Sequence, residues 1–505
     1  MSYYRTSKKS SVGKIVGLSV LAGLLIGFFI WLSWFNGAVI FRGLFTAGRG
    51  GWIFFIGIVL TLIAVTVSAI SFTRKHFLLA ALTFLTGVTI LILLIMGWVR
   101  IGYDTDKQYV ADLEVTKNQV DSYEPRAPYD VAVASASRNL QDTRGDVQAT
   151  KSLADQSTNG TWNTLVVRRG FAQGYESLQT LDLPLYGSPS NSQVDLCKFD
   201  KRSELRLGGG FPHNNLDRAI LNIAPLDVTF ENDDVYGYCV DKTPYVVVPL
   251  KKVEGFYAPT WNVYGVALYN GKSGALKVYT QAKDIRKIPG PTYPISLAAQ
   301  QSGALGATGD LWDYNYGRVG YDASQNNTEV QLRKAKDGRN TTYVTALCPK
   351  GASSSIVGFV GVDAHFQGQH RNKLVLNKLS GSHTYDAIST QEDNIKTSYA
   401  NLTGWATGLE IFEVTPGIDG SWVASIGKSQ SVLYRAVISE VKGHTVYKLY
   451  DKDGNLIPDA TSGDAPTEGT PVQLPAGTEL PTLSDEQLQQ LGQEILKELG
   501  ARASK

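Results

Sequence analysis

The chain has 505 residues, of which 43% are hydrophobic and 19% are charged, and its formal net charge is +2. A net charge this close to zero excludes an electrostatic argument for binding nucleic acid or an anionic surface. The average composition is that of a soluble protein, but the longest hydrophobic runs all lie before residue 100, so the two parts of the chain need separate treatment.

Three long apolar runs open the chain. A helix that crosses about 30 Å of hydrocarbon needs roughly 20 apolar residues, and three runs meet this requirement: Ile15–Phe35, Trp52–Phe72 and Phe77–Val99. Backbone groups in lipid must be hydrogen-bonded within the segment, so we expect three transmembrane helices that form an anchor over residues 15–99. Their interiors contain no Asp, Glu, Lys or Arg, which argues against a pump or transporter acting alone.

Basic residues around these runs predict the orientation. Cytoplasmic connections carry an excess of Lys and Arg, and two alternate segments are basic: the tail 1–14, with Arg5, Lys8, Lys9 and Lys14, and the short connection 71–77, with Arg74 and Lys75. Arg42 and Arg49 in the first loop weaken this bias without reversing it. We therefore expect a cytoplasmic tail, and residues after 100 outside the plasma (inner) membrane.

The first apolar run also contains a GxxxG pair, Gly23 and Gly27. Small residues at this spacing let a second helix approach closely, although glycine is common in membrane helices for other reasons. The partners expected from the sequence are therefore the lipid bilayer and other envelope or membrane proteins, which would bind through the head, through this pair or through the C-terminal helix.

The remainder of the chain divides by composition. Residues 100–161 are polar and poor in large apolar side chains, which favours a stalk or collar. Residues 162–458 contain short runs of Val, Ile, Tyr and Thr broken by Gly, Asn, Asp and Pro, the pattern of strands and turns. Asn270-Gly271 and Ser273-Gly274 predict a β-hairpin over 260–280, because these residues supply the positive φ values of tight turns.

The C-terminal part is expected to be a linker and a helix. Residues 459–482 are rich in Pro, Thr and Gly, which favours an extended linker. In residues 483–505, Ser484 and Gln487 form a capping box before a run of leucines on one helical face. The predicted fold class is therefore α+β, with three transmembrane helices, a mainly β extracytoplasmic head that could comprise two subdomains, and a C-terminal amphipathic helix.

Three cysteines are present: Cys197, Cys239 and Cys348. In an oxidising compartment two of them can pair and one is left over. Cys197 and Cys239 are the favoured pair because both lie in predicted strands that close a moderate loop. Three free thiols are the alternative.

The sequence GDLWDYNYGRVGYD, residues 309–322, is the main candidate binding site. Aromatic faces beside carboxylates suit a sugar or a protein loop, and the residues expected to bind are Trp312, Asp313, Tyr314, Tyr316 and Tyr321. Asp310 and Asp313 also allow a glycosidase, which needs an acid and a base or nucleophile. Packing in the core is the simplest alternative.

A candidate metal site comprises Asp363, His365 and His370. Alternation along a strand puts residues 363 and 365 on one face, but the spacing is looser than that of most zinc sites, and polar residues at the end of a strand are the alternative. No complete phosphate-binding loop or G-x-S-x-G nucleophile motif is present, and no cofactor is expected.

These observations favour a non-catalytic integral membrane protein that presents an extracytoplasmic binding or assembly domain. It would act as an adhesin or as a subunit of an envelope, surface, secretion or transfer complex. The alternatives are a membrane-tethered hydrolase acting on envelope glycan or peptide, and a subunit of a membrane channel. Four N-x-S/T sequons, the first at Asn159, leave a eukaryotic secretory setting open.

Overall fold

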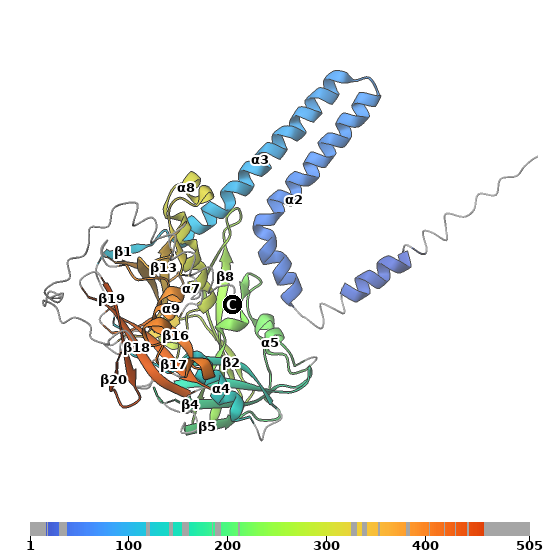
Figure 1. Cartoon of the computed structure of the whole chain (residues 1–505). Helices are drawn as coiled ribbons and strands as arrows, with labels where there is room; N and C mark the ends of the chain where they lie inside the picture. The colour runs from blue at the N-terminus through green and yellow to red at the C-terminus, as the bar shows by residue number, and fades with distance from the viewer. Residues whose placement is uncertain are drawn as a thin grey trace, which may run out of the picture. The chain divides into compact units, whose positions relative to one another are not determined.

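The computed structural model describes residues 17, 19–29, 38–117, 122–140, 145–153, 161–183, 185–186, 193–210, 213–324, 331–335, 341–351, 354–379, 384–402, 404–418, 420–429, 431–441 and 444–458 (Figure 1). All of them belong to one of the chain's two compact units, Met1–Ala460. The predicted tail 1–14, linker 459–482 and amphipathic helix 483–505 lie outside the described residues.

Two apolar helices precede the β-rich region. They are α2 (Ala38–Thr73) and α3 (Phe77–Tyr109), and both contain a segment long and apolar enough to cross a membrane. The turn between them contains Lys75 at φ +64°, so the expected tight connection is present. Of the first predicted helix, Ser19–Phe29 is described and is helical, but it is shorter than a membrane span.

Small residues line the contact between α2 and α3. A Cβ atom on Gly87 would lie 3.4 Å from the Cβ of Ala64, and Ser68 Oγ donates a hydrogen bond of 2.8 Å to the Ala80 carbonyl. Such residues allow two helix backbones to approach closely. Most large apolar side chains on the outer faces of these helices are exposed. The helical hairpin therefore has a large apolar surface, which would be unfavourable in contact with water.

Four sheets build the region that follows, here called the head. The first has the order β1-β15-β14-β13-β11, with β12 also paired to β13; the second has β10-β9-β8-β6, with β7 also paired to β8; the third has β16-β17-β18-β19-β20; and the fourth has β2-β3-β4-β5. The strands of the first sheet are β1 (Glu114–Lys117), β11 (Tyr321–Ala323), β12 (Gln331–Lys334), β13 (Thr341–Pro349), β14 (Gly358–Asp363) and β15 (Leu374–Lys378). Those of the second are β6 (Val228–Thr229), β7 (Tyr236–Val240), β8 (Thr243–Glu254), β9 (Thr260–Asn270) and β10 (Leu276–Tyr279). The third and fourth comprise β16 (Glu410–Pro416), β17 (Trp422–Lys428), β18 (Ser431–Val441), β19 (His444–Asp451), β20 (Leu456–Ile457), β2 (Gly145–Leu153), β3 (Thr161–Arg168), β4 (Tyr175–Asp182) and β5 (Gln193–Lys198).

Short helices connect these strands. They are α4 (Tyr129–Arg138), α5 (Leu216–Ile223), α6 (Ala282–Ile285), α7 (Ile295–Gly303), α8 (Leu311–Tyr316) and α9 (Ile388–Ser398), with 3-10 turns η2 (Asn232–Asp234), η3 (Ala304–Thr308) and η4 (Trp405–Thr407). The predicted hairpin at 260–280 is confirmed: β9 and β10 pair antiparallel, and Asn270 Oδ1 accepts hydrogen bonds from the backbone N–H groups of Lys272 and Ser273.

The largest hydrophobic core joins α3 to the head. Tyr109 and Val110, at the end of α3, are buried in one cluster with Val263 of β9, Leu297 of α7 and Val360 of β14. Two further clusters lie between the β2–β5 and β8–β9 strands, and beneath α9 against β16–β18. The end of α3 is therefore a core element of the head.

Residues 100–161, for which the sequence predicted a polar stalk or collar, contain regular helices and strands. This segment contains the outer end of α3, then β1, which pairs in parallel with β15, then α4 and β2, which joins β3. The low average hydrophobicity concealed a few buried apolar residues, among them Tyr109, Val131 and Ala132. An edge strand such as β1 is held in the sheet by backbone hydrogen bonds, which do not require apolar side chains.

Candidate functional site

The predicted aromatic binding sequence forms α8 and the start of β11. Asp310 caps α8, because its Oδ1 accepts a hydrogen bond of 2.8 Å from the Asp313 N–H, which satisfies one of the helix's unpaired donors. Gly317 ends α8 with φ +62°, a conformation that glycine adopts without steric cost. The carboxylate proposed as one half of a glycosidase pair therefore has a role in capping.

Tyr314 faces α3. Its hydroxyl donates a hydrogen bond of 2.7 Å to Asp106 Oδ2, and its ring packs edge-on against Tyr103 at 5.5 Å between centroids. Lys350 Nζ lies 5.3 Å from the centre of the same ring, a cation-π arrangement. Burial, and then the bond to Asp106, raise the pKa of Tyr314, so its hydroxyl remains a donor at physiological pH.

Two more side chains of α3 bind the turn that leads into α8. The Tyr103 hydroxyl donates to the Gly309 carbonyl at 3.1 Å, and Lys107 Nζ donates to the Ala307 carbonyl at 3.2 Å. Carbonyls near the end of η3 are thus satisfied by α3 rather than by water. We call this set of contacts between α3 and residues 307–314 the α3–α8 joint.

The other side of α3 is held by the second sheet and by Arg371. Gln108 Nε2 donates to the Ala258 carbonyl at 3.2 Å, and the Trp261 N–H donates to the Tyr109 hydroxyl at 2.8 Å. Arg371 donates through Nη2 to the Gln108 carbonyl at 2.9 Å and through Nη1 to the Trp261 carbonyl at 3.1 Å. A cation is favoured here because the carbonyls at the C-terminus of a helix carry partial negative charge.

The five aromatic and acidic residues predicted as one binding surface are divided by the structure. Trp312 and Tyr316 stack at 6.2 Å between centroids and are 65% and 64% exposed, whereas Tyr314 turns toward α3. Residues four apart share a helix face and residues two apart do not. Asp313 is half-buried on α8, and Tyr321 lies on β11, where Lys378 Nζ is 5.3 Å from its ring centre.

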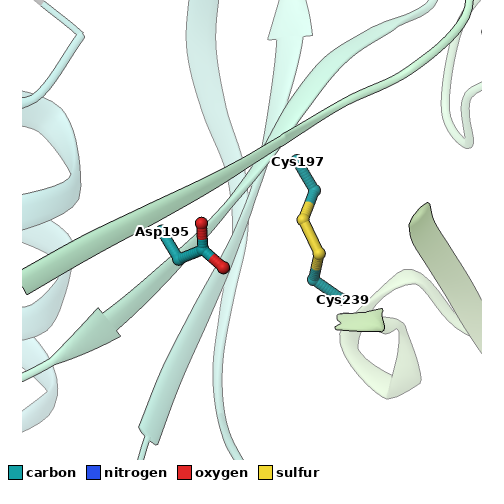
Figure 2. A group of neighbouring side chains, drawn as sticks. All are labelled: Asp195, Cys197 and Cys239. Atoms are coloured by element: carbon teal, nitrogen blue, oxygen red, sulfur yellow. A yellow bond between two sulfur atoms is a disulfide. The ribbon is translucent and has the colours of Figure 1, made fainter. Parts of the chain in front are cut away.

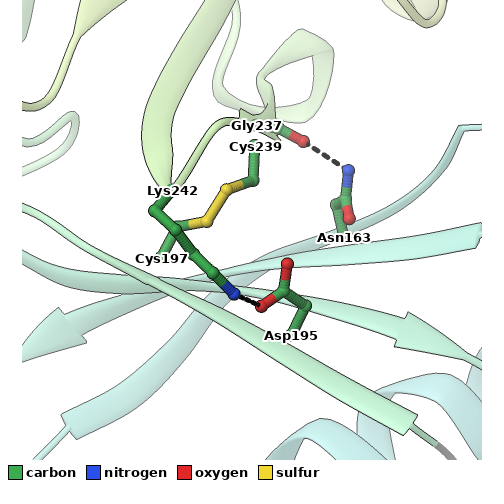
Figure 3. The surroundings of a disulfide bond; sticks show 6 residues. All are labelled: Asn163, Asp195, Cys197, Gly237, Cys239 and Lys242. Carbon is green, nitrogen blue, oxygen red and sulfur yellow. Dashed lines mark hydrogen bonds and ion pairs between the residues drawn. A yellow bond between two sulfur atoms is a disulfide. The ribbon is translucent and has the colours of Figure 1, made fainter.

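A disulfide joins Cys197 of β5 to Cys239 of β7, the pair that the sequence favoured, with 6.4 Å between the Cα atoms (Figure 2). It links the fourth sheet to the second, and the bond from Asn163 Nδ2 to the Gly237 carbonyl, 2.9 Å long, joins the same two sheets (Figure 3). Cys348 is a free thiol; burial raises its pKa, which makes it a poor nucleophile.

Asp195 lies beside this disulfide, and its carboxylate and the two sulfur atoms are all within 4.8 Å of one another (Figure 2). Three such groups could bind a metal ion if the sulfurs were thiolates. In the structure both sulfurs are bonded to each other, and Lys242 pairs with Asp195 (Figure 3). Lys242 reaches it from the two-residue β7–β8 turn, where it has φ +58°. The group is therefore a covalent and ionic bridge.

The predicted metal ligands are brought together only in part. Asp363 Oδ1 accepts a hydrogen bond of 2.8 Å from the His365 N–H, and His365 Nδ1 lies 3.4 Å from the same oxygen. Gln367 Nε2 donates to the other oxygen at 2.7 Å. Among the described residues, no three-ligand group includes His370. Asp363 thus orders the turn after β14.

A small polar cavity of about 120 Å³ lies between α4, β2 and η2. Tyr129, Gln148, Thr150, Asn232 and Asp233 contribute to its lining. These are hydrogen-bonding groups, but they include no hydroxyl or thiol paired with a histidine base, as nucleophilic catalysis requires.

The residues that the sequence reasoning missed lie on α3 beyond Val99. Tyr103, Asp106, Lys107 and Val110 recur at spacings of three and four, the period of one helix face. That period continues the preceding apolar run and would have predicted a longer helix with one face docked. Comparison with known proteins adds no further guide, because no protein-family model, curated protein or solved structure matches the chain.

Proposed function

We propose that this chain is an integral membrane protein that presents a β-rich extracytoplasmic head for binding or assembly, as a subunit of an envelope, surface, secretion or transfer complex or as an adhesin. The observation that carries the proposal is the continuity of α3, which passes from a span-length apolar segment into the core of the head without a break. A head fixed in this way has a defined height and direction, which suits assembly with neighbouring proteins.

Two observations support an outside position for the head. Arg74 and Lys75 form the turn of the α2–α3 hairpin, at the opposite end of α3 from the head, and basic connections favour the cytoplasm. The Cys197–Cys239 disulfide suits an oxidising compartment, because cytoplasmic thiols are kept reduced.

The topology can be tested with single cysteines and a membrane-impermeant thiol reagent on intact cells or spheroplasts. We expect Phe171→Cys, at a head position that is 75% exposed, to be labelled at once. Lys75→Cys should react only after the membrane is permeabilised. The unsubstituted chain, in which Cys348 is buried, gives the background. The opposite pattern of labelling would overturn the proposal.

The hydrolase alternative has its own test. Purified head would release soluble products from cell-wall glycan, and Asp310→Asn would abolish that release although asparagine remains a good helix cap. No release with the unsubstituted head would leave binding or assembly as the function.

A further inference from the structure

Exposed aromatic side chains lie at two places beside the outer end of α3. On α8, Trp312 and Tyr316 are 65% and 64% exposed, and Arg318 lies 5.0 Å from the ring centre of Tyr316. In the connection between β8 and β9, Phe256 is 59% exposed and Tyr257 is 38% exposed. We call these four side chains the aromatic footprint. Figure 1 shows α8 beside the end of α3, and the Trp261 N–H of β9 donates to Tyr109 of α3.

The α3–α8 joint gives the depth of α8 along α3. Val99 is the last residue of the apolar run, and the contacts to α8 and the turn before it start at Tyr103 and include Asp106. At 1.5 Å per residue these positions lie about 6 and 10 Å beyond Val99. The polar headgroup layer extends roughly 5–8 Å beyond the hydrocarbon on each side. The side chains of α8 therefore lie at the level of the headgroups or at their outer edge.

The β8–β9 connection adjoins α3 on its other contact side. The Ala258 carbonyl accepts a hydrogen bond from Gln108, and the next strand, β9, contacts Tyr109 through Trp261. Gln108 lies about 14 Å beyond Val99 at 1.5 Å per residue. Tyr257 and Phe256, the two residues before Ala258, can span up to about 7 Å when extended, which brings their rings within reach of the outer edge of the headgroup layer.

The chemistry of the footprint fits the lipid interface. Tyr and Trp prefer the headgroup region, because a large apolar ring and a polar group are both satisfied there. Arg318, which is exposed on the same turn, supplies a cation for a phosphate. In water, by contrast, the exposed parts of these four rings would have no apolar contact.

We infer that the aromatic footprint is a membrane-seating surface, in which α8 and the β8–β9 connection rest in the phospholipid headgroup layer on two sides of α3. This inference rests on the proposed function, since it requires α3 to span the bilayer. It adds that the head is supported by lipid at two points and is thereby held against tilting about α3.

The test uses the full chain in phosphatidylcholine nanodiscs with single cysteines that carry an environment-sensitive fluorophore. The positions are Trp312→Cys, Phe256→Cys, Phe171→Cys and Leu93→Cys. Phe171 is 75% exposed in the β3–β4 turn, and Leu93 is 58% exposed within α3. Nitroxide groups are placed either on the lipid headgroup or near the end of the acyl chain, so quenching reports depth.

We expect the headgroup nitroxide to reduce the fluorescence of the labels at 312 and 256 and to leave the label at 171 unchanged. Quenching at neither position, or at only one, would overturn the two-point seat. The label at 93 separates this failure from failure of the proposed function. The acyl-chain nitroxide should quench the fluorescence of the label at 93. Without this quenching, α3 does not span the bilayer and the proposed function is wrong.

Discussion

Tyr314 contributes two separable contacts at the α3–α8 joint, a ring that packs on Tyr103 and a hydroxyl that donates to Asp106. Tyr314→Phe keeps the ring and removes only the donor, which leaves the half-buried carboxylate of Asp106 without this partner. A hydrogen bond to a charged group contributes about 1.5–3 kcal/mol. We expect a loss of unfolding free energy near the lower end of that range, because the site is only half-buried.

Tyr316→Phe is the matched control, since it removes a hydroxyl from the same helix at a position that is 64% exposed. Chemical denaturation of both variants, followed by tryptophan fluorescence, measures the difference. Equal stability of the two variants would contradict the role assigned to the Tyr314 hydroxyl.

Asp234 should make the stability of the head depend on pH. It accepts hydrogen bonds of 2.8 and 2.7 Å from the Ser296 N–H and Oγ, but burial raises its pKa to about 6. The folded protein therefore binds this proton more tightly than the unfolded chain, in which Asp titrates at about 3.9. By linkage, stability falls as the pH rises from about 4 to about 6 and then stays at the lower level.

Asp234→Asn should remove this fall, which is on the order of 3 kcal/mol for a rise of roughly two pKa units at about 1.4 kcal/mol per unit. Thermal unfolding of the two proteins across this pH range measures it. Asp233→Asn, at the neighbouring exposed position, is the control and should keep the slope. A slope that persists in Asp234→Asn would show that another group causes it.

At the scale of elements, the Cys197–Cys239 disulfide ties β5 to β7 across a sequence separation of 42 residues. In the chain-entropy account, a loop of this length is worth about 4 kcal/mol of unfolding free energy. Replacement of both cysteines by serine should lower stability by about 2–4 kcal/mol, because neighbouring contacts, such as Asn163 with Gly237, persist.

Denaturant titration of the oxidised protein, the reduced protein and the double variant measures this contribution. The reduced protein should match the double variant. If reduction changed nothing, the cysteines would be unpaired in solution. The free Cys348 is present in all three samples and cancels in the comparison.

At the scale of the whole molecule, the structure predicts that a stable soluble head must begin earlier in the chain than residue 162, the start that the composition predicts. Tyr109 and Val110 are buried in the largest core, and β1 completes the edge of the first sheet. A fragment that begins at Ile101 should therefore fold, whereas one that begins at Glu114 loses two core side chains, at a cost of about 3–5 kcal/mol for an aromatic residue alone.

Thermal unfolding with both fragments ending at Pro458 measures the difference, and we expect a lower midpoint for the shorter fragment. A fragment that begins at Trp162, the predicted start of the head, should not fold cooperatively, because it also lacks β2 and α4. Equal midpoints for the first two fragments would contradict a structural role for the end of α3.

The sequence predicts those parts of the structure that are determined by neighbouring residues, and it does not predict those that depend on contacts between distant segments. The second and third apolar runs and the Asn270 hairpin carry their own signal, in composition and in turn residues, and the structure contains the two helices and the hairpin. The position of β1 is set by pairing with β15, more than two hundred residues later, which no local pattern encodes.

The candidate site shows the same division between local and distant signals. Trp312 and Tyr316 could be predicted as exposed, but the turn of Tyr314 toward Asp106 depends on an element far away in the chain. Buried arginines are the extreme case. Arg333 and Arg435 donate to backbone carbonyls, at Pro416 and at Arg126 respectively. Composition would have placed both on the surface.

The continuity of α3 also has a mechanical consequence. Its 33 residues form a rod about 50 Å long at 1.5 Å per residue, clamped at one end by the head and joined at the other to the turn at Lys75. A rotation of the head by about 10° moves that turn sideways by about 9 Å for a rod of this length. A small angular change at the head would thus become a displacement of nearly a helix diameter at the turn, so the seating that limits the tilt of the head would also fix the position of the turn.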